Sequence, residues 1–293
     1  MTTLLWFRRD LRLADNPALN AAVAIGRPVI PVFICDDADA GEWSPGGATR
    51  WWLQGSLSAL SSEIKARGNR LILKTGPAEV VINELLSETG ATSVYWNRRY
   101  EPWATQRDEK IKTSLKGKGI EARSFNAGLL REPWTVTTQK GQPYKVFTPF
   151  WKALRASGEP DQLKPSPQRI PSPNDFAESD DLNSLGLLPT KPDWAGGLRD
   201  AWTPGEDAAQ WRLHDFTDAA VFDYQDKRNL PGVSGTSRLS PHLHFGEIGP
   251  RQMWRAVVAS ALAQTGSPMP RGVEAYLSEI AWREFSYHLL FHF

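Results

Sequence analysis

Short apolar runs alternate with longer segments of helical periodicity through roughly the first 130 residues of the chain. The run Pro28–Ile34 is rich in β-branched residues, as is typical of a strand buried in a parallel sheet. The expected strands are Thr3–Phe7, Pro28–Ile34, Arg70–Thr75, Ser93–Trp96 and Ile120–Phe125, and the expected helices are Pro17–Ile25, Arg50–Arg67, Ala78–Thr89 and Trp103–Lys116. This alternation predicts an α/β domain over residues 1–130 with a doubly wound, Rossmann-like parallel sheet.

The pattern changes after this domain. Residues 131–205 are crowded with prolines, which remove backbone donors and disfavour helix, so we expect a long interdomain connector. Residues 206–293 read as helical, with expected helices at Glu206–Phe216, Ala219–Arg228, Pro250–Gln264 and Gly272–Phe293. The last helical pattern has no Gly, Asn or Pro stop signal, so we expect an all-helical domain that is incomplete in this chain.

Composition narrows the class of protein only slightly. The chain has 293 residues and a net charge of +1, so any nucleic-acid contact must come from a local basic group. The 13 Trp residues fit either core packing or stacking surfaces for flat ligands. The single cysteine, Cys35, cannot form an internal disulfide, which fits a reducing compartment. The first apolar run ends at Arg8 and is too short for the core of a signal peptide, so we expect a cytoplasmic protein. No apolar run is long enough for a membrane span, so we expect no membrane association.

Several common motifs are absent or incomplete. Neither a Gly-x-Gly-x-x-Gly nor a Walker sequence occurs, which argues against a nicotinamide enzyme or an NTPase. The stretch Pro45–Arg50 leads into a helix and fits a simple turn better than an anion site. The i,i+4 pair His288/His292 could bind a metal, but neither it nor His242/His244 has a cysteine or a completed zinc pattern, so we expect no metal.

Two stretches in the helical part carry candidate chemistry. Gly235–Ser240 combines hydroxyls with Arg238 in a loop entering a helix, a combination that suits a diphosphate or an ordinary capped turn. Glu279, Trp282 and Arg283 have the i, i+3, i+4 spacing of one helix face, which predicts either an intrahelical Glu–Arg pair beside a core Trp or a surface that stacks on and hydrogen-bonds a flat ligand. Arg228, next to Lys227, is either a solvated side chain or a phosphate contact.

Six stretches together resemble the photolyase/cryptochrome family, in family order from one end of the chain to the other. They are Leu5–Asn16, Ser124–Ala127, Lys145–Phe150, Gly235–Pro241, His244–Ile248 and Glu279–Phe285. Arg99–Trp103 and Leu130–Trp134 are similar to the bacterial cyclobutane pyrimidine dimer photolyases closest to plant cryptochromes, the class III branch.

The resemblance implies an antenna domain, a connector and a helical FAD-binding domain. It implies light-driven repair of pyrimidine dimers in DNA, with reduced FAD as electron donor and the lesion flipped out of the duplex. Residues implied to bind FAD are Tyr224, Thr236, Ser237, Arg238, Leu239, Ser240, Tyr276, Glu279 and Arg283. Glu279 is implied to hydrogen-bond the flipped pyrimidines, Trp282 to stack beside them, and Arg228 to contact a DNA phosphate.

Three alternatives to dimer repair remain open. A cryptochrome is a light-signalling protein whose matching helix usually lacks both the Glu and the Trp, and a (6-4) photolyase usually has Gln in place of Glu279. A nucleotide-binding α/β protein without photochemistry would lack flavin absorbance. Relatives with a folate antenna often have an Asn-Glu pair where this chain has Trp103-Ala104. We therefore expect methenyltetrahydrofolate to bind as antenna pigment in another mode, near Glu101 and the Trp51-Trp52 doublet, with a deazaflavin as the alternative. We expect a monomer, and a protein ending at Phe293 should neither retain FAD nor repair DNA.

Overall fold

The computed structural model describes residues 2–37 and 41–293, and it divides the chain into two compact units. The first unit contains the chain up to Ala127 together with Lys164–Glu206 and His244–Glu247. The second unit contains Gly128–Leu163, Asp207–Leu243 and Ile248–Phe293. Each unit is described by itself below.

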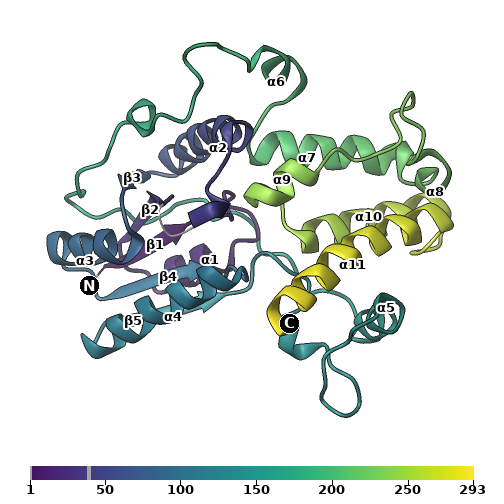
Figure 1. The fold of residues 1–293 in the computed structure, drawn as a ribbon, viewed down its shortest axis with the longest axis horizontal. Coiled ribbons are helices and arrows are strands. Elements are labelled where there is room, and N and C mark those ends of the chain that lie inside the picture. The colour runs from purple at the N-terminus through teal and green to yellow at the C-terminus, as the bar shows by residue number, and fades with distance from the viewer. Residues whose placement is uncertain (1, 38–40) are drawn as a thin grey trace. The chain divides into compact units, whose positions relative to one another are not determined.

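The first unit is built on a five-stranded sheet in the order β3-β2-β1-β4-β5, in which every neighbouring pair is parallel (Figure 1). The strands are β1 (Thr3–Phe7), β2 (Val29–Cys35), β3 (Ile72–Thr75), β4 (Ser93–Asn97) and β5 (Glu121–Phe125). The order reverses direction at β1, as in a doubly wound fold. The predicted α/β class is therefore confirmed.

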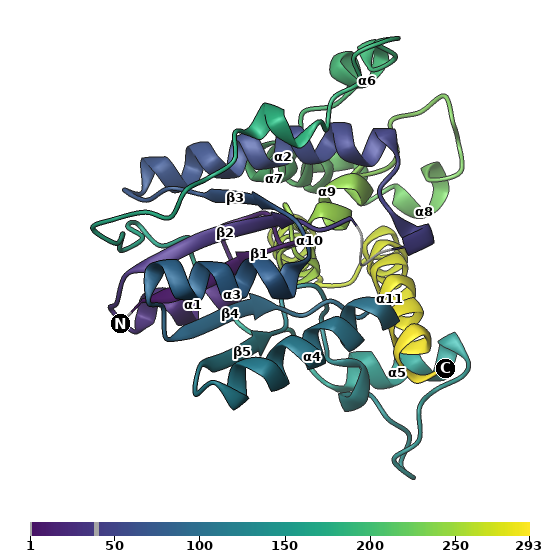
Figure 2. The same ribbon diagram turned by 60° about the vertical axis from the view of Figure 1, so that its left-hand side comes forward.

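Helices cover both faces of this sheet, which is why its central strands are apolar throughout (Figure 2). Leu5 and Phe7 of β1 pack with α1 (Pro17–Ala24) and α2 (Gly47–Ala66). Leu4 and Trp6 pack with α3 (Ala78–Thr89) and α4 (Pro102–Gly117) on the other face. The observed ends of α1, α2 and α4 differ from the predicted ones by a few residues, because helix ends are the least sharply defined part of a helix.

The proline-rich residues 131–205, expected to form one connector, are divided between the two units. The part from Lys164 onward, which includes α6 (Gly196–Ala201), packs on the first unit and buries Ile170 completely. The Ile170 amide donates to the Arg67 carbonyl (3.0 Å), and the Pro171 carbonyl accepts from the Val29 amide (2.8 Å). Prolines cannot donate, but the carbonyls of an extended segment still accept hydrogen bonds from the domain that it crosses.

The stretch His244–Glu247 is held in the first unit by a buried carboxylate and a close backbone approach. Glu247 is fully buried and accepts hydrogen bonds from Trp52 Nε1 (3.1 Å), Ser56 Oγ and the Gly205 amide (2.7 Å). Phe245 stacks on Trp52 with an interplanar angle of 7°. This stretch, quoted above for the family resemblance, therefore anchors the architecture of the first unit.

The second unit is helical, as predicted. Its helices are α5 (Phe147–Ala156), α7 (Glu206–Asp215), α8 (Tyr224–Lys227), α9 (Ser240–Phe245), α10 (Pro250–Thr265) and α11 (Arg271–His292), of which α7 and α9 each have one end in the first unit. The expected helix Ala219–Arg228 is interrupted: a π-helical turn, Phe216–Ala220, follows α7, and only Tyr224–Lys227 is α-helical. Within the described residues, no helix is long and apolar enough to span a membrane.

Candidate functional site

The Gly235–Ser240 stretch and α11 meet in the second unit through Tyr276. The Tyr276 hydroxyl donates to Ser237 Oγ at 3.1 Å, and its ring makes an edge contact with Tyr224, with centroids 5.1 Å apart. Both tyrosines are buried, and this burial raises the pKa of each phenol. The two stretches that the sequence singled out are therefore in contact through Tyr276, and Tyr224 of α8 packs on the Tyr276 ring.

Glu279 forms an ion pair with Arg228, and not the intrahelical pair with Arg283 that its spacing allows. The side chains of Arg228 and Glu279 are 32% and 38% exposed, and the Arg228 guanidinium lies 5.6 Å from the centre of the Tyr224 ring. This ion pair raises the pKa of Arg228. A carboxylate and a guanidinium thus stand together at the surface beside the buried tyrosines.

Arg283 makes its contacts elsewhere. Its Nη1 donates to the Gly128 carbonyl at 2.7 Å, and the guanidinium lies over the Tyr287 ring. The next residue, Glu284, is fully enclosed and accepts backbone hydrogen bonds from Leu130 (2.8 Å) and Arg131 (3.3 Å). In this structure these two residues hold residues 128–131 against α11, and the expected FAD contact of Arg283 stays a prediction.

Glu284 predicts a pH-dependent stability for the second unit. Burial raises the pKa of Glu284 to about 7, against the charge of Arg283 and the two backbone donors. Between pH 4.5 and 7 the folded state keeps a proton that the unfolded state releases, so stability is lost as pH rises through this window, by about 3 kcal/mol in total. Glu284→Gln keeps an acceptor oxygen and cannot titrate. We expect urea unfolding monitored by Trp fluorescence to show a flatter pH dependence for this variant, and an unchanged slope would contradict the assignment.

The Gly235–Ser240 stretch presents polar groups on an anchored loop. Gly235 packs against Lys227 so closely that a Cβ would lie 2.7 Å from the Lys227 Cβ, and Leu239 is buried. Thr236, Arg238 and Ser240 are exposed. A rigid loop that offers hydroxyls and a guanidinium to solvent suits an anionic ligand.

Arg212 of α7 belongs to the same site and was not found from the sequence. Its pKa is lowered, first by burial and then by the neighbouring charge of Arg238. The positive charges of Arg212 and Arg238 thus act on each other, while Asp215 opposes this shift. No motif surrounds Arg212, so only the fold could reveal it.

Trp282 is 45% exposed on α11, and one face of its indole is covered by Phe147, the first residue of α5. The sequence marked Lys145–Phe150 as a family stretch but gave no role to Phe147. Trp282 thus lies at the surface three residues from Glu279 on the same helix.

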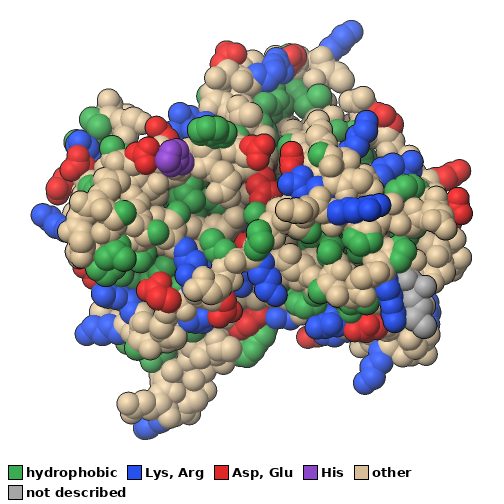
Figure 3. All heavy atoms as spheres, turned by 180° about the vertical axis from the view of Figure 1, so that it is seen from behind, with side chains coloured by type: hydrophobic (Ala, Val, Ile, Leu, Met, Phe, Trp, Pro, Cys, Tyr) green, Lys and Arg blue, Asp and Glu red, His purple; other side chains and the backbone are tan. Residues whose placement is uncertain are grey.

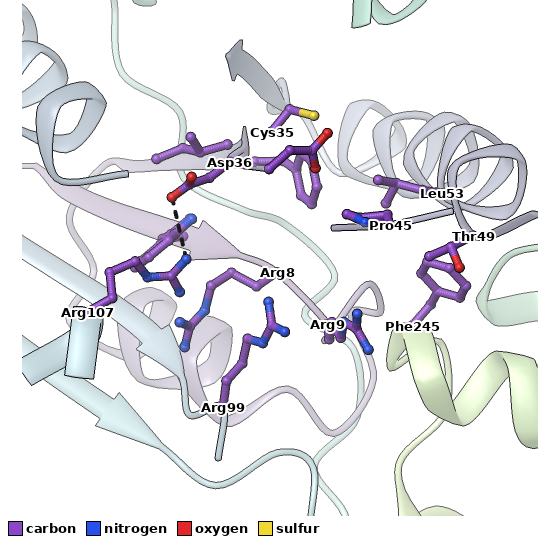
Figure 4. Close-up of a pocket in the computed structure, with 14 residues that line it drawn as sticks. Arg8, Arg9, Cys35, Asp36, Pro45, Thr49, Leu53, Arg99, Arg107 and Phe245 are labelled. Carbon is purple, nitrogen blue, oxygen red and sulfur yellow. Dashed lines mark hydrogen bonds and ion pairs between the residues drawn. The ribbon is translucent and has the colours of Figure 1, made fainter. Parts of the chain in front are cut away.

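The first unit contains a separate hollow of about 80 Å³ at the carboxyl ends of β1 and β2 (Figure 4). Its lining residues are Trp6, Arg8, Arg9, Phe33, Ile34, Cys35, Asp36, Asp37, Pro45, Thr49, Leu53, Arg99, Arg107 and Phe245. Burial lowers the pKa of the Arg8 guanidinium; Asp108 opposes this shift, and the charges of Arg107 and Arg99 add to it. The hollow is therefore rich in positive charge and has aromatic walls.

The two residues expected near an antenna pigment lie in different surroundings. Trp51 is buried in the core formed with α2 and makes an edge contact with Trp52. Glu101 pairs with Arg99, a residue that lines the hollow, at 2.7 Å. Burial acts to raise the pKa of Glu101, but the charge and hydrogen bonds of Arg99 outweigh it, so the pKa falls to about 2. Glu101 thus contributes to the charge balance beside the hollow.

His288 serves the packing of the second unit. His288 is buried, accepts from the Tyr144 amide at 3.0 Å through Nε2, and its Nδ1 lies 3.1 Å from the Pro133 carbonyl. Across residues 2–37 and 41–293, no cluster of His, Cys, Asp and Glu has the arrangement of a metal site. On the face drawn in Figure 3, Lys and Arg side chains are interspersed with Asp and Glu, so contacts to a polyanion would depend on local groups such as Arg228.

The chain thus combines a doubly wound α/β unit with a helical unit in which aromatic, hydroxyl and arginine side chains gather around Tyr276. A family model described as DNA photolyase matches residues 3–172, and the chain belongs to this family. The resemblance seen in the six sequence stretches is thereby confirmed.

Two relatives and one solved structure place the chain within the family. It is 47% identical over 290 residues to the deoxyribodipyrimidine photo-lyase of Agrobacterium fabrum, covering 99% of this chain and 59% of the relative. It is 34% identical to cryptochrome-1 of Arabidopsis thaliana, covering 99% of this chain and 43% of the relative. The crystal structure of a bacterial class III photolyase from Agrobacterium tumefaciens superposes with a TM-score of 0.93 at 46% identity, covering all of this chain and 59% of that one. The chain thus spans less than two thirds of these relatives.

Proposed function

We propose that this protein carries out light-driven repair of cyclobutane pyrimidine dimers in DNA. The observation that carries the proposal is the joint presence of Glu279 and the exposed ring of Trp282 on α11, beside the buried tyrosines and the hydroxyl-bearing loop. The similarity to a photo-lyase and to a class III photolyase structure supports it. In this reading the protein is a carbon–carbon lyase that acts on dimer-containing DNA.

The donor groups present in the second unit fit FAD. Thr236, Ser237 and Ser240 supply hydroxyls, and Arg212 and Arg238 supply neighbouring positive charges for a diphosphate. Leu239 and Gly235 hold the loop in place, while Tyr224 and Tyr276 wall the site. When bound and reduced, FAD supplies light absorption and the transferable electron.

The protein's own residues bind and orient the lesion. Glu279 accepts hydrogen bonds from the flipped pyrimidines, and Trp282 stacks on them through its uncovered face. Arg228 contacts a DNA phosphate and, before DNA arrives, holds the Glu279 carboxylate in place through their ion pair. The modest net charge of the chain makes such local contacts necessary for binding.

The arginine-rich hollow of the first unit is our proposed antenna site. Its aromatic walls, together with Arg9, Arg99 and Arg107, suit a flat heteroaromatic pigment with an anionic tail. Methenyltetrahydrofolate fits this description, with a deazaflavin as the alternative. A pigment whose absorbance is lost on Arg107→Gln while FAD is retained would support this site; retention of the pigment would contradict it.

The second candidate function is blue-light signalling, favoured by the similarity to a plant cryptochrome. The two functions separate when the protein of natural length is illuminated with dimer-containing DNA and restored thymine is assayed. Repair that depends on light is the expected result. Light-dependent flavin reduction without repair would contradict the proposal and support signalling. Repair confined to (6-4) lesions would identify the protein as a (6-4) photolyase instead. We further propose that the protein acts as a cytoplasmic monomer.

A further inference from the structure

The ring of Phe147 lies face-on against the ring of Trp282, with centroids 3.7 Å apart and an interplanar angle of 9°. Phe285 makes edge contacts with both rings, with its centroid 6.0 Å from that of Trp282 and 5.9 Å from that of Phe147. One face and part of the edge of the indole are thereby covered. Trp282 nevertheless remains 45% exposed, which leaves the opposite face to the solvent side.

The overlap of the two rings is set by the helices that carry them. Aromatic pairs prefer offset or edge-to-face arrangements with centroids about 4.5–7 Å apart, so full overlap at 3.7 Å is not the arrangement that two free rings adopt. Helix α5 packs on α11 through Phe150, which is buried with its ring 5.2 Å from that of Phe285 and 5.1 Å from that of His288. The packing of α5 on α11 therefore presses Phe147 onto Trp282.

We propose that Phe147 is a positioning residue for Trp282, which fixes the plane of the indole so that its free face is ready to stack on a flipped pyrimidine. This inference rests on the proposed repair function. An exposed indole without such a backing ring would sample several rotamers, and ordering it on binding would cost affinity. Phe147 removes that cost in advance while contacting no DNA itself.

Phe147→Leu tests the proposal in the flavin-loaded protein, because leucine fills the space without supplying a ring plane. We expect the Kd for dimer-containing DNA to rise about tenfold, the scale of one stacked base, while the repair rate at saturating DNA stays within about twofold. Phe147→Tyr keeps the ring and should restore the wild-type Kd. Trp151→Phe is the matched control on α5, since Trp151 makes its edge contact with Trp254, and its Kd should not change.

Hydroxyl-radical labelling of Trp282, read by mass spectrometry, supplies a measurement that does not depend on repair. Labelling should rise severalfold in Phe147→Leu and stay at the wild-type level in Phe147→Tyr and Trp151→Phe. Wild-type selectivity for dimer DNA that survives Phe147→Leu unchanged would overturn the positioning role alone. If the wild-type protein shows no selectivity for dimer DNA, the proposed function is overturned. This holds even if Phe147→Leu raises the labelling of Trp282 as expected.

Discussion

Replacing Glu279 with alanine is expected to slow repair of dimer-containing DNA at limiting substrate by about tenfold to a hundredfold, the value of one or two hydrogen bonds to a charged group. The loss falls on the lesion because the flavin side of the site is held by other contacts, namely the Tyr276–Ser237 hydrogen bond and the packing of Tyr224. Stability should change little, since the Arg228 left behind is 32% exposed and can be hydrated. Bound FAD, measured by its absorbance, should stay at the wild-type ratio.

Glu274→Ala is the matched control on the same helix. Glu274 pairs with Arg155 at 2.8 Å, with both side chains about half exposed, so its removal deletes a surface ion pair without touching the proposed lesion site. Repair by this variant should stay within about twofold of wild type, because exposed pairs contribute little. If Glu279→Ala loses FAD, the role of Glu279 is to bind the cofactor and not the lesion. Wild-type repair by the same variant would remove Glu279 from the reaction.

Features of local sequence predicted much of this molecule. The parallel sheet was readable because strands buried on both faces are continuous apolar runs, such as Val29–Cys35. The shared face of Glu279 and Trp282 was readable because helical spacing alone decides it. The Gly235–Ser240 loop was readable because glycine, hydroxyl and arginine residues occur together in a short stretch.

Features that depend on distant residues were not predictable. Glu279 had an arginine at i+4, yet its partner is Arg228, 51 positions away, because the packing of α8 on α11 decides which guanidinium is closer. Arg212 lies in no motif, and Phe147 had no role assigned within its family stretch, so their importance arises only from the neighbours that the fold gives them. The prolines of residues 131–205 predicted little helix, although the segment contains α5 and α6, and they did not predict which amides would bond to its carbonyls.

Gly246→Ala is expected to destabilise the first unit by at least about 4 kcal/mol, the range reached only by severe core defects. Gly246 has a φ of +69°, a conformation that costs an L-residue about 1–2 kcal/mol by itself. A Cβ at this position would also lie 2.1 Å from the Arg9 carbonyl oxygen and 2.6 Å from the Asp10 Cα. Both are backbone atoms next to β1, where the Leu11 amide donates to the Phe245 carbonyl, so relief would require the two segments to separate.

Gly26→Ala isolates the clash from the backbone conformation. Gly26 lies in the same unit with a φ of +72°, and a Cβ there would meet no atom within 4 Å. Urea unfolding of both variants, followed by Trp fluorescence, should show a loss of about 1–2 kcal/mol for Gly26→Ala and a much larger one for Gly246→Ala. If both variants lose the same free energy of unfolding, the positive φ accounts for the whole effect. The segments around Gly246 then move apart at little cost to accommodate the added methyl group. A large difference would show that the approach of Gly246 to Arg9 holds His244–Glu247 in the first unit, and with it the buried Glu247 that ties α2 to the Gly205 backbone.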